Sequence, residues 1–88
     1  MATSLLRARR VLVVEDEYVI AKSLSDNFRS AGSLLGGPVP SVEGAIEKIE
    51  AEPRLDAAVV DVNLGGVMAY DVADLLVARK IPFVFSSG

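Results

Sequence analysis

Two segments of the chain are apolar at every position and end directly in acidic residues. Residues 11–14 read Val-Leu-Val-Val and are followed by Glu15 and Asp16, and residues 57–60 read Ala-Ala-Val-Val and are followed by Asp61. Unbroken apolar runs of this length, rich in β-branched residues, are typical of strands buried on both faces of a parallel sheet. The pattern therefore predicts two central strands, each with acidic side chains at its carboxyl end.

Two further segments have a weaker strand pattern. Residues 33–40 contain Gly36, Gly37 and Pro38, which an edge strand tolerates better than a central strand. Residues 81–85 read Ile-Pro-Phe-Val-Phe, with the proline near the start, where a missing backbone donor does least harm. We expect the first segment at an edge of the sheet and the second as the fourth strand in chain order.

Apolar residues recur at helical spacing between these strands. Helices are expected over residues 17–31, from the N-cap Ser41 to about Glu52, and over residues 69–80, with a flexible loop at residues 65–66. The expected core stripes are formed by Ile20, Leu24 and Phe28, by Val42, Ala45, Ile46 and Ile49, and by Ala69, Val72, Ala73 and Leu76. Strands and helices thus alternate along the whole chain.

The alternation predicts the fold class. Four strands joined by helices through short connections run parallel with right-handed crossovers, which gives an α/β fold with a doubly wound parallel sheet and three helices. Such sheets bind ligands outside the carboxyl ends of their strands. We expect one domain over residues 10–88, preceded by a flexible arm over residues 1–9.

The composition excludes several classes of function. The 88 residues carry 9 Lys and Arg against 12 Asp and Glu, a net charge of −3 that argues against nucleic acids and anionic membranes as partners. The absence of Cys and His excludes disulfides, thiolate nucleophiles, imidazole bases and the usual zinc ligands. Neither a secretory leader nor an apolar run of ~20 residues is present, so we expect a cytoplasmic protein.

The acidic residues at the strand ends are the candidate chemistry. If the two central strands are neighbours, about 4.8 Å apart, then Glu15, Asp16 and Asp61 converge on one small pocket. Three carboxylates in such a pocket repel one another, and raised pKa values or a bound cation relieve the repulsion. Mg²⁺ is the expected cation because it prefers hard oxygen ligands. We expect direct ligation by Asp16 and Asp61, a water-mediated contact from Glu15, and a backbone carbonyl ligand near Asn63.

Each of these residues also has a plainer interpretation. Glu15 and Asp16 precede a helix and would complement its dipole, and Ser86 alone would be an ordinary hydroxyl at a strand end. Asp61 is harder to explain in this way, because an acid that ends a buried strand costs free energy unless it is paired or bound to a cation. Asp61 is also the candidate covalent nucleophile, with Ser86 and the backbone N–H groups of residues 63–66 as donors to a phosphoryl group.

Three runs resemble the motifs of one protein family, in matching order and at matching spacing. They are Val11-Leu-Val-Val-Glu-Asp-Glu17, Val60-Asp-Val-Asn-Leu-Gly65 and Pro82-Phe-Val-Phe-Ser-Ser-Gly88. Together they resemble the receiver domain of bacterial two-component response regulators. The likeness covers nearly the whole chain.

The resemblance implies a flavodoxin-like strand order, 2-1-3-4, and a role for each site residue. Asp61 would be the phosphoacceptor, Glu15 and Asp16 the acidic pair that binds Mg²⁺, and Ser86 the hydroxyl that contacts the phosphoryl group and moves on activation. The phosphoryl donor would be a sensor histidine kinase or a histidine phosphotransfer protein. On this interpretation the chain is not an enzyme but a phosphoprotein of phosphorelay signal transduction.

The sequence departs from the family after the fourth strand. Receiver domains continue with a fourth helix, a fifth strand ending in a Lys that pairs with the phosphoryl group, and a fifth helix, none of which this sequence contains. Lys80 cannot substitute, because it precedes the fourth strand and so lies at the opposite end of the sheet. We therefore expect impaired phosphorylation. We also expect a homodimer or higher oligomer that buries the exposed fourth strand.

Two other functions stay open. A noncatalytic pseudo-receiver, acting only as an interaction or dimerisation module, would show no effect of Mg²⁺. A Mg²⁺-dependent phosphatase with Asp61 as nucleophile would turn over a phosphate ester. Asn63 stands where such a phosphatase needs a second acid, and an amide cannot protonate a leaving group.

Overall fold

The computed structural model describes residues 7–86, which form a central parallel sheet between two helical layers. In chain order the elements are β1 (Arg10–Val14), α2 (Tyr18–Ser30), β2 (Leu34–Val39), α3 (Val42–Ala51), β3 (Ala57–Asp61), β4 (Asn63–Leu64), β5 (Val67–Met68), α4 (Tyr70–Ala78) and β6 (Phe83–Ser86). The sheet order is β2-β1-β3-β6, with every neighbouring pair parallel. This order confirms the predicted fold class, with β6 as the fourth strand and β2 at an edge.

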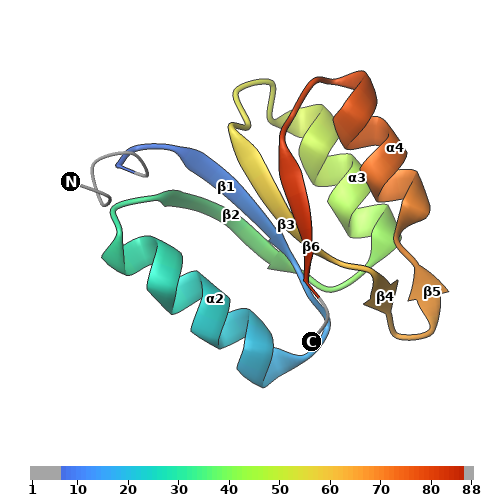
Figure 1. Cartoon of the computed structure of the whole chain (residues 1–88), viewed down its shortest axis with the longest axis horizontal. Coiled ribbons are helices and arrows are strands. Elements are labelled where there is room, and N and C mark those ends of the chain that lie inside the picture. The colour runs from blue at the N-terminus through green and yellow to red at the C-terminus, as the bar shows by residue number, and fades with distance from the viewer. Residues whose placement is uncertain (1–6, 87–88) are drawn as a thin grey trace.

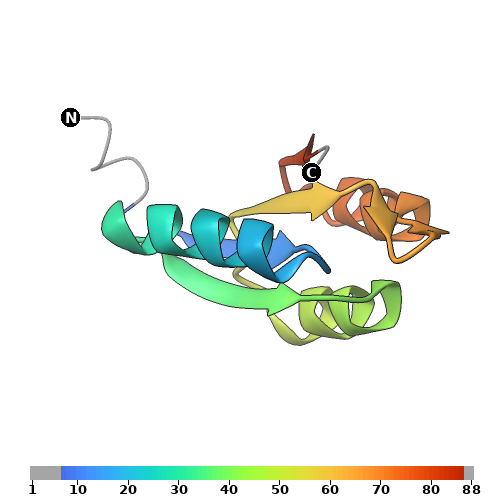
Figure 2. The same cartoon turned by 90° about the horizontal axis from the view of Figure 1, so that it is seen from below.

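The helices divide between the two faces of the sheet, with α2 on one face and α3 and α4 together on the other (Figures 1 and 2). The main hydrophobic core lies in the α3–α4 layer, where Leu12, Ile49, Val60 and Leu76 are completely buried. Burying a side chain of this size contributes roughly 1.5–3 kcal/mol. The core therefore holds the two apolar strands β1 and β3 side by side, which places their carboxyl ends at one edge of the sheet.

The opposite face is only partly covered, because α2 packs mainly on β2 and β1. The buried side chains of α2 are Ala21 and Ser25. Ile20, Leu24 and Phe28, which were predicted to form a core stripe, are half-buried. Their helical spacing was predicted correctly, but their burial was overestimated, since no helix among residues 7–86 covers the β3–β6 half of this face (Figure 1).

Local interactions begin and end helices at the residues that the sequence predicted, and they also shape the edge strand. Ser41 caps α3, because its Oγ accepts a hydrogen bond from the Gly44 N–H at 3.0 Å. Gly32 follows α2 with φ +88°, the left-handed conformation common after helix ends. In β2, Gly37 has φ +123°, and a Cβ there would lie 2.7 Å from the Val13 carbonyl oxygen. Glycine is therefore required where the edge strand passes close to β1.

Residues 63–68 form a short antiparallel hairpin rather than the flexible loop expected at residues 65–66. Asn63 pairs with Met68 and Leu64 with Val67. Gly65 and Gly66 make the turn with φ values of +61° and +91°, as a two-residue turn of type I′ requires. The Asn63 Oδ1 atom accepts a hydrogen bond from the Gly66 N–H at 2.7 Å, which closes the turn.

The last residues of the predicted N-terminal arm are tied to the start of the sheet. The Ala8 N–H donates to the Gly32 carbonyl at 2.9 Å, and the Arg9 carbonyl accepts from the Leu34 N–H at 2.8 Å. The rest of the predicted arm, residues 1–6, lies outside the described residues. None of the helices described in residues 7–86 has the length and apolar character needed to cross a membrane.

Candidate metal centre

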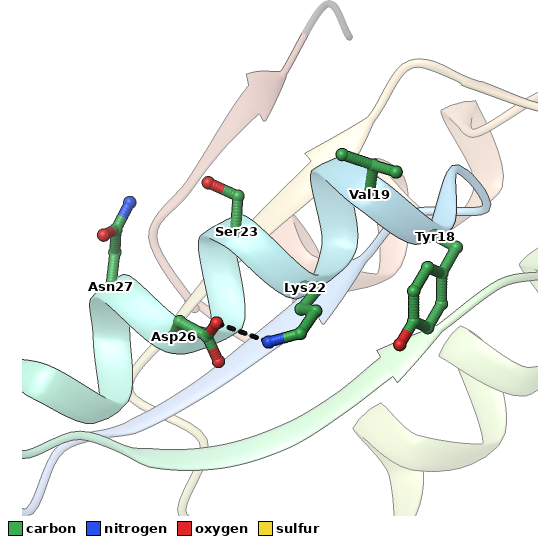
Figure 3. Close-up of a pocket in the computed structure, with 6 residues that line it drawn as sticks. All are labelled: Tyr18, Val19, Lys22, Ser23, Asp26 and Asn27. Carbon is green, nitrogen blue, oxygen red and sulfur yellow. Dashed lines mark hydrogen bonds and ion pairs between the residues drawn. The ribbon is translucent and has the colours of Figure 1, made fainter.

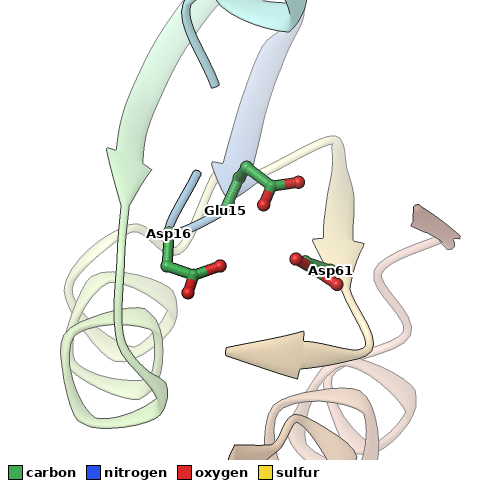
Figure 4. Close-up of side chains that lie close together, drawn as sticks. All are labelled: Glu15, Asp16 and Asp61. Carbon is green, nitrogen blue, oxygen red and sulfur yellow. The ribbon is translucent and has the colours of Figure 1, made fainter. Parts of the chain in front are cut away.

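Three carboxylates meet at the carboxyl edge of the sheet, where the two central strands end. β1 and β3 are in register, with Val14 opposite Val60, so the residues that follow them, Glu15 and Asp61, leave the sheet side by side. Glu15, Asp16 and Asp61 each place one carboxylate oxygen within 4.8 Å of the others (Figure 4). The structure thus brings together the three acids that the sequence pattern indicated.

Glu15 is the most perturbed group of this cluster. Its side chain is 2% exposed, and its Oε1 atom has no hydrogen-bond partner in the described part of the chain. Burial is the largest cause that raises the pKa of Glu15, and together with the side chain and charge of Asp61 and the charge of Asp16 it brings this pKa to about 7. The Glu17 N–H, which donates to Oε2 at 3.3 Å, offsets part of the increase in this pKa. A buried carboxylate oxygen without a partner is a position that a cation would stabilise.

Asp61 and Asp16 have different surroundings. Asp61 is 8% exposed, and its Oδ1 atom accepts a hydrogen bond from the Asn63 N–H at 3.1 Å, which orients the carboxylate. Asp16 is exposed, and its Oδ2 atom lies 3.6 Å from the position that a Cβ on Gly65 would occupy. The turn between β4 and β5 therefore forms one side of the cluster. Sequence analysis predicted a flexible loop at Gly65 and not a turn beside Asp16, although the Gly-Gly pair between apolar residues is a hairpin signal.

No basic side chain neutralises this cluster among residues 7–86. The ion pairs found there engage other carboxylates: Asp26, Glu50, Glu52 and Asp56. Lys80 precedes β6, whose first residue, Phe83, pairs with Ala58 near the amino end of β3. Lys80 therefore lies at the far end of the sheet, as predicted. Hard oxygen donors with uncompensated negative charge match the ligand preference of Mg²⁺, so these residues suit that cation.

Ser86 lies beside Asp61, since the two residues are partners in the β3–β6 register. Partners in a parallel sheet point to the same face, so both side chains lie on the face that carries α2. The Ser86 carbonyl accepts from the Val62 N–H at 3.4 Å, which keeps the strands paired up to the cluster. Asn63 is held by its own turn, and the predicted ligation by its backbone carbonyl stays a prediction.

A separate surface hollow lies along the outer side of α2 (Figure 3). The figure labels the residues that line it: Tyr18, Val19, Lys22, Ser23, Asp26 and Asn27. Its one cation and one carboxylate pair with each other, with Lys22 Nζ 2.8 Å from Asp26 Oδ2. Because these charges satisfy one another in solvent, the hollow carries no evidence of a ligand.

Comparison with solved structures identifies similar folds and sequences. SdrG from Sphingomonas melonis Fr1 superposes with a TM-score of 0.82 at 43% identity, over 89% of this chain and 66% of the SdrG chain. The BeF3-activated conformation of SdrG, from Pseudomonas melonis Fr1, gives a TM-score of 0.74 at 41% identity, over 90% of this chain and 67% of that chain. No protein-family profile and no curated protein sequence matches the chain.

Matches at lower sequence identity include proteins that are named as response regulators. The response regulator PhyR from Brucella abortus matches with a TM-score of 0.81 at 25% identity, over 96% of this chain and 36% of PhyR. The REC domain of the Erythrobacter litoralis PhyR response regulator matches with a TM-score of 0.79 at 25% identity, over 92% of this chain and 64% of that domain. The chain thus spans about two thirds of SdrG and about a third of the Brucella protein. With this sheet order, and with 67% of an SdrG structure matched at 41% identity, the chain belongs to the receiver domains of two-component response regulators.

Proposed function

We propose that this chain accepts a phosphoryl group on Asp61 from a phosphohistidine, carried by a sensor histidine kinase or a histidine phosphotransfer protein. One observation carries the proposal: three carboxylate oxygens lie within 4.8 Å of one another at the carboxyl edge of the sheet. The register that pairs Asp61 with Ser86 supports it, since it sets a hydroxyl donor beside the acceptor. This function places the protein in the cytoplasm, where the phosphohistidine donor would be met.

The proposed cofactor is Mg²⁺, held directly by Asp16 and Asp61, through a water by Glu15, and by the backbone carbonyl of Asn63. When bound, Mg²⁺ supplies positive charge that offsets the charge of the carboxylates and of the phosphoryl oxygens. The Oε1 atom of Glu15 supports this assignment, because it is buried among negative charges and finds no hydrogen-bond donor among residues 7–86.

The proposed transfer is a displacement at phosphorus. An oxygen of the Asp61 carboxylate forms the new P–O bond as the P–N bond of the phosphohistidine breaks, and the imidazole leaves with the electron pair of that bond. The Asn63 N–H fixes Oδ1 of Asp61, which leaves Oδ2 as the attacking atom. The Ser86 hydroxyl is then the donor to a phosphoryl oxygen, and its movement would report the phosphorylated state.

We expect this transfer to be impaired in the present chain. The described residues offer the cluster no cation, because their ion pairs engage other carboxylates. Fixed positive charge at a transferring phosphoryl group stabilises its transition state, so transfer without it is slower. The chain accepts one phosphoryl group and turns nothing over, so it is not an enzyme on this proposal.

The proposal is tested by incubating the chain with Mg²⁺ and acetyl phosphate, followed by mass spectrometry. We expect Mg²⁺-dependent addition of one phosphoryl group, which is lost in Asp61→Asn and retained in the control Asp71→Asn, an exposed acid on α4. Labelling that survives in Asp61→Asn would contradict the proposal. A complete lack of labelling, with no effect of Mg²⁺ on the protein, would instead identify a pseudo-receiver.

A parallel incubation with Mg²⁺ and a phosphate ester tests the phosphatase alternative. Steady release of phosphate from an ester such as p-nitrophenyl phosphate would favour a phosphatase and contradict the acceptor role. Asn63 argues against that outcome, because its side chain closes the β4–β5 turn by accepting the Gly66 N–H. This side chain is an amide, and an amide cannot protonate a leaving group.

A further inference from the structure

The basic side chains of the chain gather at the end of the sheet opposite the acidic cluster, where the four strands begin and the three helices end (Figure 1). Of the nine Lys and Arg residues, eight lie at or before the start of a strand or at the end of a helix: Arg7, Arg9, Arg10, Arg29, Lys48, Arg54, Arg79 and Lys80. The exception is Lys22, in the first half of α2. We call the part of this end formed by residues 7–10, 34 and 52–56 the basic edge.

Helix dipoles account for some of these cations but not for those of the basic edge. Arg29 and Lys48 lie in the last turns of α2 and α3, where a cation complements the dipole. Arg9, Arg10 and Arg54 lie outside the helices. A local structural role therefore does not explain why three guanidinium groups stand at the amino ends of β1 and β3.

The acids nearby neutralise these arginines only loosely. Arg9 Nη1 lies 3.8 Å from Asp56 Oδ1, and Arg10 Nη1 lies 3.9 Å from Glu52 Oε2, in ion pairs that solvent reaches. No ion pair among residues 7–86 engages Arg54, which is exposed. Each guanidinium carries five N–H donors, so contacts as long as these leave most of them free to bind another anionic group.

A hollow of about 490 Å³ lies at the basic edge. Its lining combines charged and apolar side chains: Arg10, Arg54 and Asp56 with Leu34, Pro53 and Leu55. The β1–β2 register sets Leu34 beside Arg10, and Asp56 exchanges two hydrogen bonds of 2.8 Å with the Arg10 backbone. Leu34 is 47% exposed. The hollow is thus built on paired strand ends and offers an apolar surface between cations.

We propose that the basic edge docks an acidic segment of a partner protein, in which carboxylates flank an apolar side chain. The apolar side chain packs in the hollow against Leu34 and Leu55, and the carboxylates accept hydrogen bonds from Arg10 and Arg54. The planar guanidinium group matches a carboxylate in geometry as well as in charge. Five residue steps along β1, about 16 Å, separate Arg10 from Glu15, so this docking leaves the metal centre open to a phosphoryl donor.

Other classes of occupant fit the basic edge less well. A single-stranded nucleic acid needs cations along its phosphates and aromatic side chains for its bases, but Glu52 and Asp56 stand among the arginines and none of the described residues lining the hollow is aromatic. An anionic membrane meets the same acids, in a chain with a net charge of −3. A second copy would have to present its acidic carboxyl edge, and this head-to-tail contact would cover its own metal centre.

NMR titration of the isotope-labelled chain tests the proposal, with a blocked octapeptide of alternating glutamate and leucine as the probe. The amide signals of residues 8–10, 34 and 54–56 should shift, and added salt should weaken the binding. Arg54→Glu should weaken it by roughly tenfold. The control Lys22→Glu makes the same charge reversal at a 59% exposed position and should leave the affinity unchanged. Shifts confined to other residues, or equal affinities of the two variants, would overturn the proposal.

Further probes separate the occupants. The octapeptide with serine in place of leucine should bind roughly tenfold more weakly, because it leaves the hollow unfilled, and equal binding would overturn the role of the hollow. Tighter binding of single-stranded oligothymidine or of phosphatidylglycerol vesicles, or salt-dependent self-association of the chain alone, would overturn the assignment to an acidic protein segment. Labelling of Asp61 by acetyl phosphate should be the same in Arg54→Glu as in the wild type, so failure of the docking proposal leaves the phosphoryl-acceptor proposal untouched.

Discussion

Replacement of Glu15 by glutamine should remove most of the pH dependence of stability of the metal-free chain between about pH 5 and about pH 8. Burial, followed by the influence of Asp61 and Asp16, raises the pKa of Glu15 from 4.5 to about 7 in the folded chain. The folded state therefore keeps a proton that the unfolded state has released. The resulting stability is complete below pH 4.5 and is lost as the pH rises through about 7. At about 1.4 kcal/mol per pKa unit, the difference between the folded and unfolded pKa values of Glu15 contributes on the order of 3 kcal/mol to the free energy of unfolding.

Urea unfolding followed by circular dichroism, with a chelator present, measures this effect. The free energy of unfolding of the wild type should fall by about 2–3 kcal/mol between the two pH values, and that of Glu15→Gln should change much less. Glu17→Gln makes the same change at an exposed position two residues away and should follow the wild type. Added Mg²⁺ should stabilise the wild type more than Glu15→Gln at the higher pH, because the cation binds the ionised form. Parallel pH profiles for the wild type and Glu15→Gln would refute the reasoning.

Three further predictions concern the fold and are checked by the same unfolding assay. Ser41→Ala removes the cap of α3 and should cost about 1 kcal/mol, and no loss would show that the cap is dispensable. Gly37→Ala should destabilise the chain more than Gly66→Ala, because both glycines have positive φ but a Cβ on Gly37 would lie 2.7 Å from the Val13 carbonyl and one on Gly66 would meet nothing within 4 Å. Equal losses would contradict that contact. Leu76→Ala opens a cavity at a fully buried position and should cost about 2–5 kcal/mol, so a loss below about 1 kcal/mol would contradict the described core.

The acidic cluster could be predicted because two strong patterns place acids at the ends of buried strands, and the resemblance to receiver domains implied the strand order that makes those strands neighbours. Residues 11–14 and 57–60 are unbroken apolar runs. Both contribute side chains to the same hydrophobic core, and the two strands pair side by side. Since each run is followed by acids, pairing of these two strands in register brings Glu15 and Asp61 together. The local sequence pattern and the packing of these distant segments therefore indicate the same site.

The features that sequence analysis missed depend on tertiary surroundings. The β4–β5 hairpin has strands of two residues each, which are too short to show a period of alternation. The burial of Leu24 and Phe28 depends on which strands α2 covers, and helical spacing alone does not contain that information. The buried, unpartnered oxygen of Glu15 likewise arises only when the ends of β1 and β3 are assembled.

The most direct test of the central claim, that three carboxylates share one divalent cation, is titration of the isotope-labelled chain with Mn²⁺, observed by NMR. Mn²⁺ accepts the same oxygen ligands as Mg²⁺ and broadens the signals of nuclei close to it. The account predicts that the backbone amides of Glu15, Asp16 and Asp61 broaden first, that Mg²⁺ reverses the broadening, and that Asp61→Asn weakens it. Broadening that begins instead at the exposed acids of α2 or α3, or that Asp61→Asn leaves unchanged, would contradict the account.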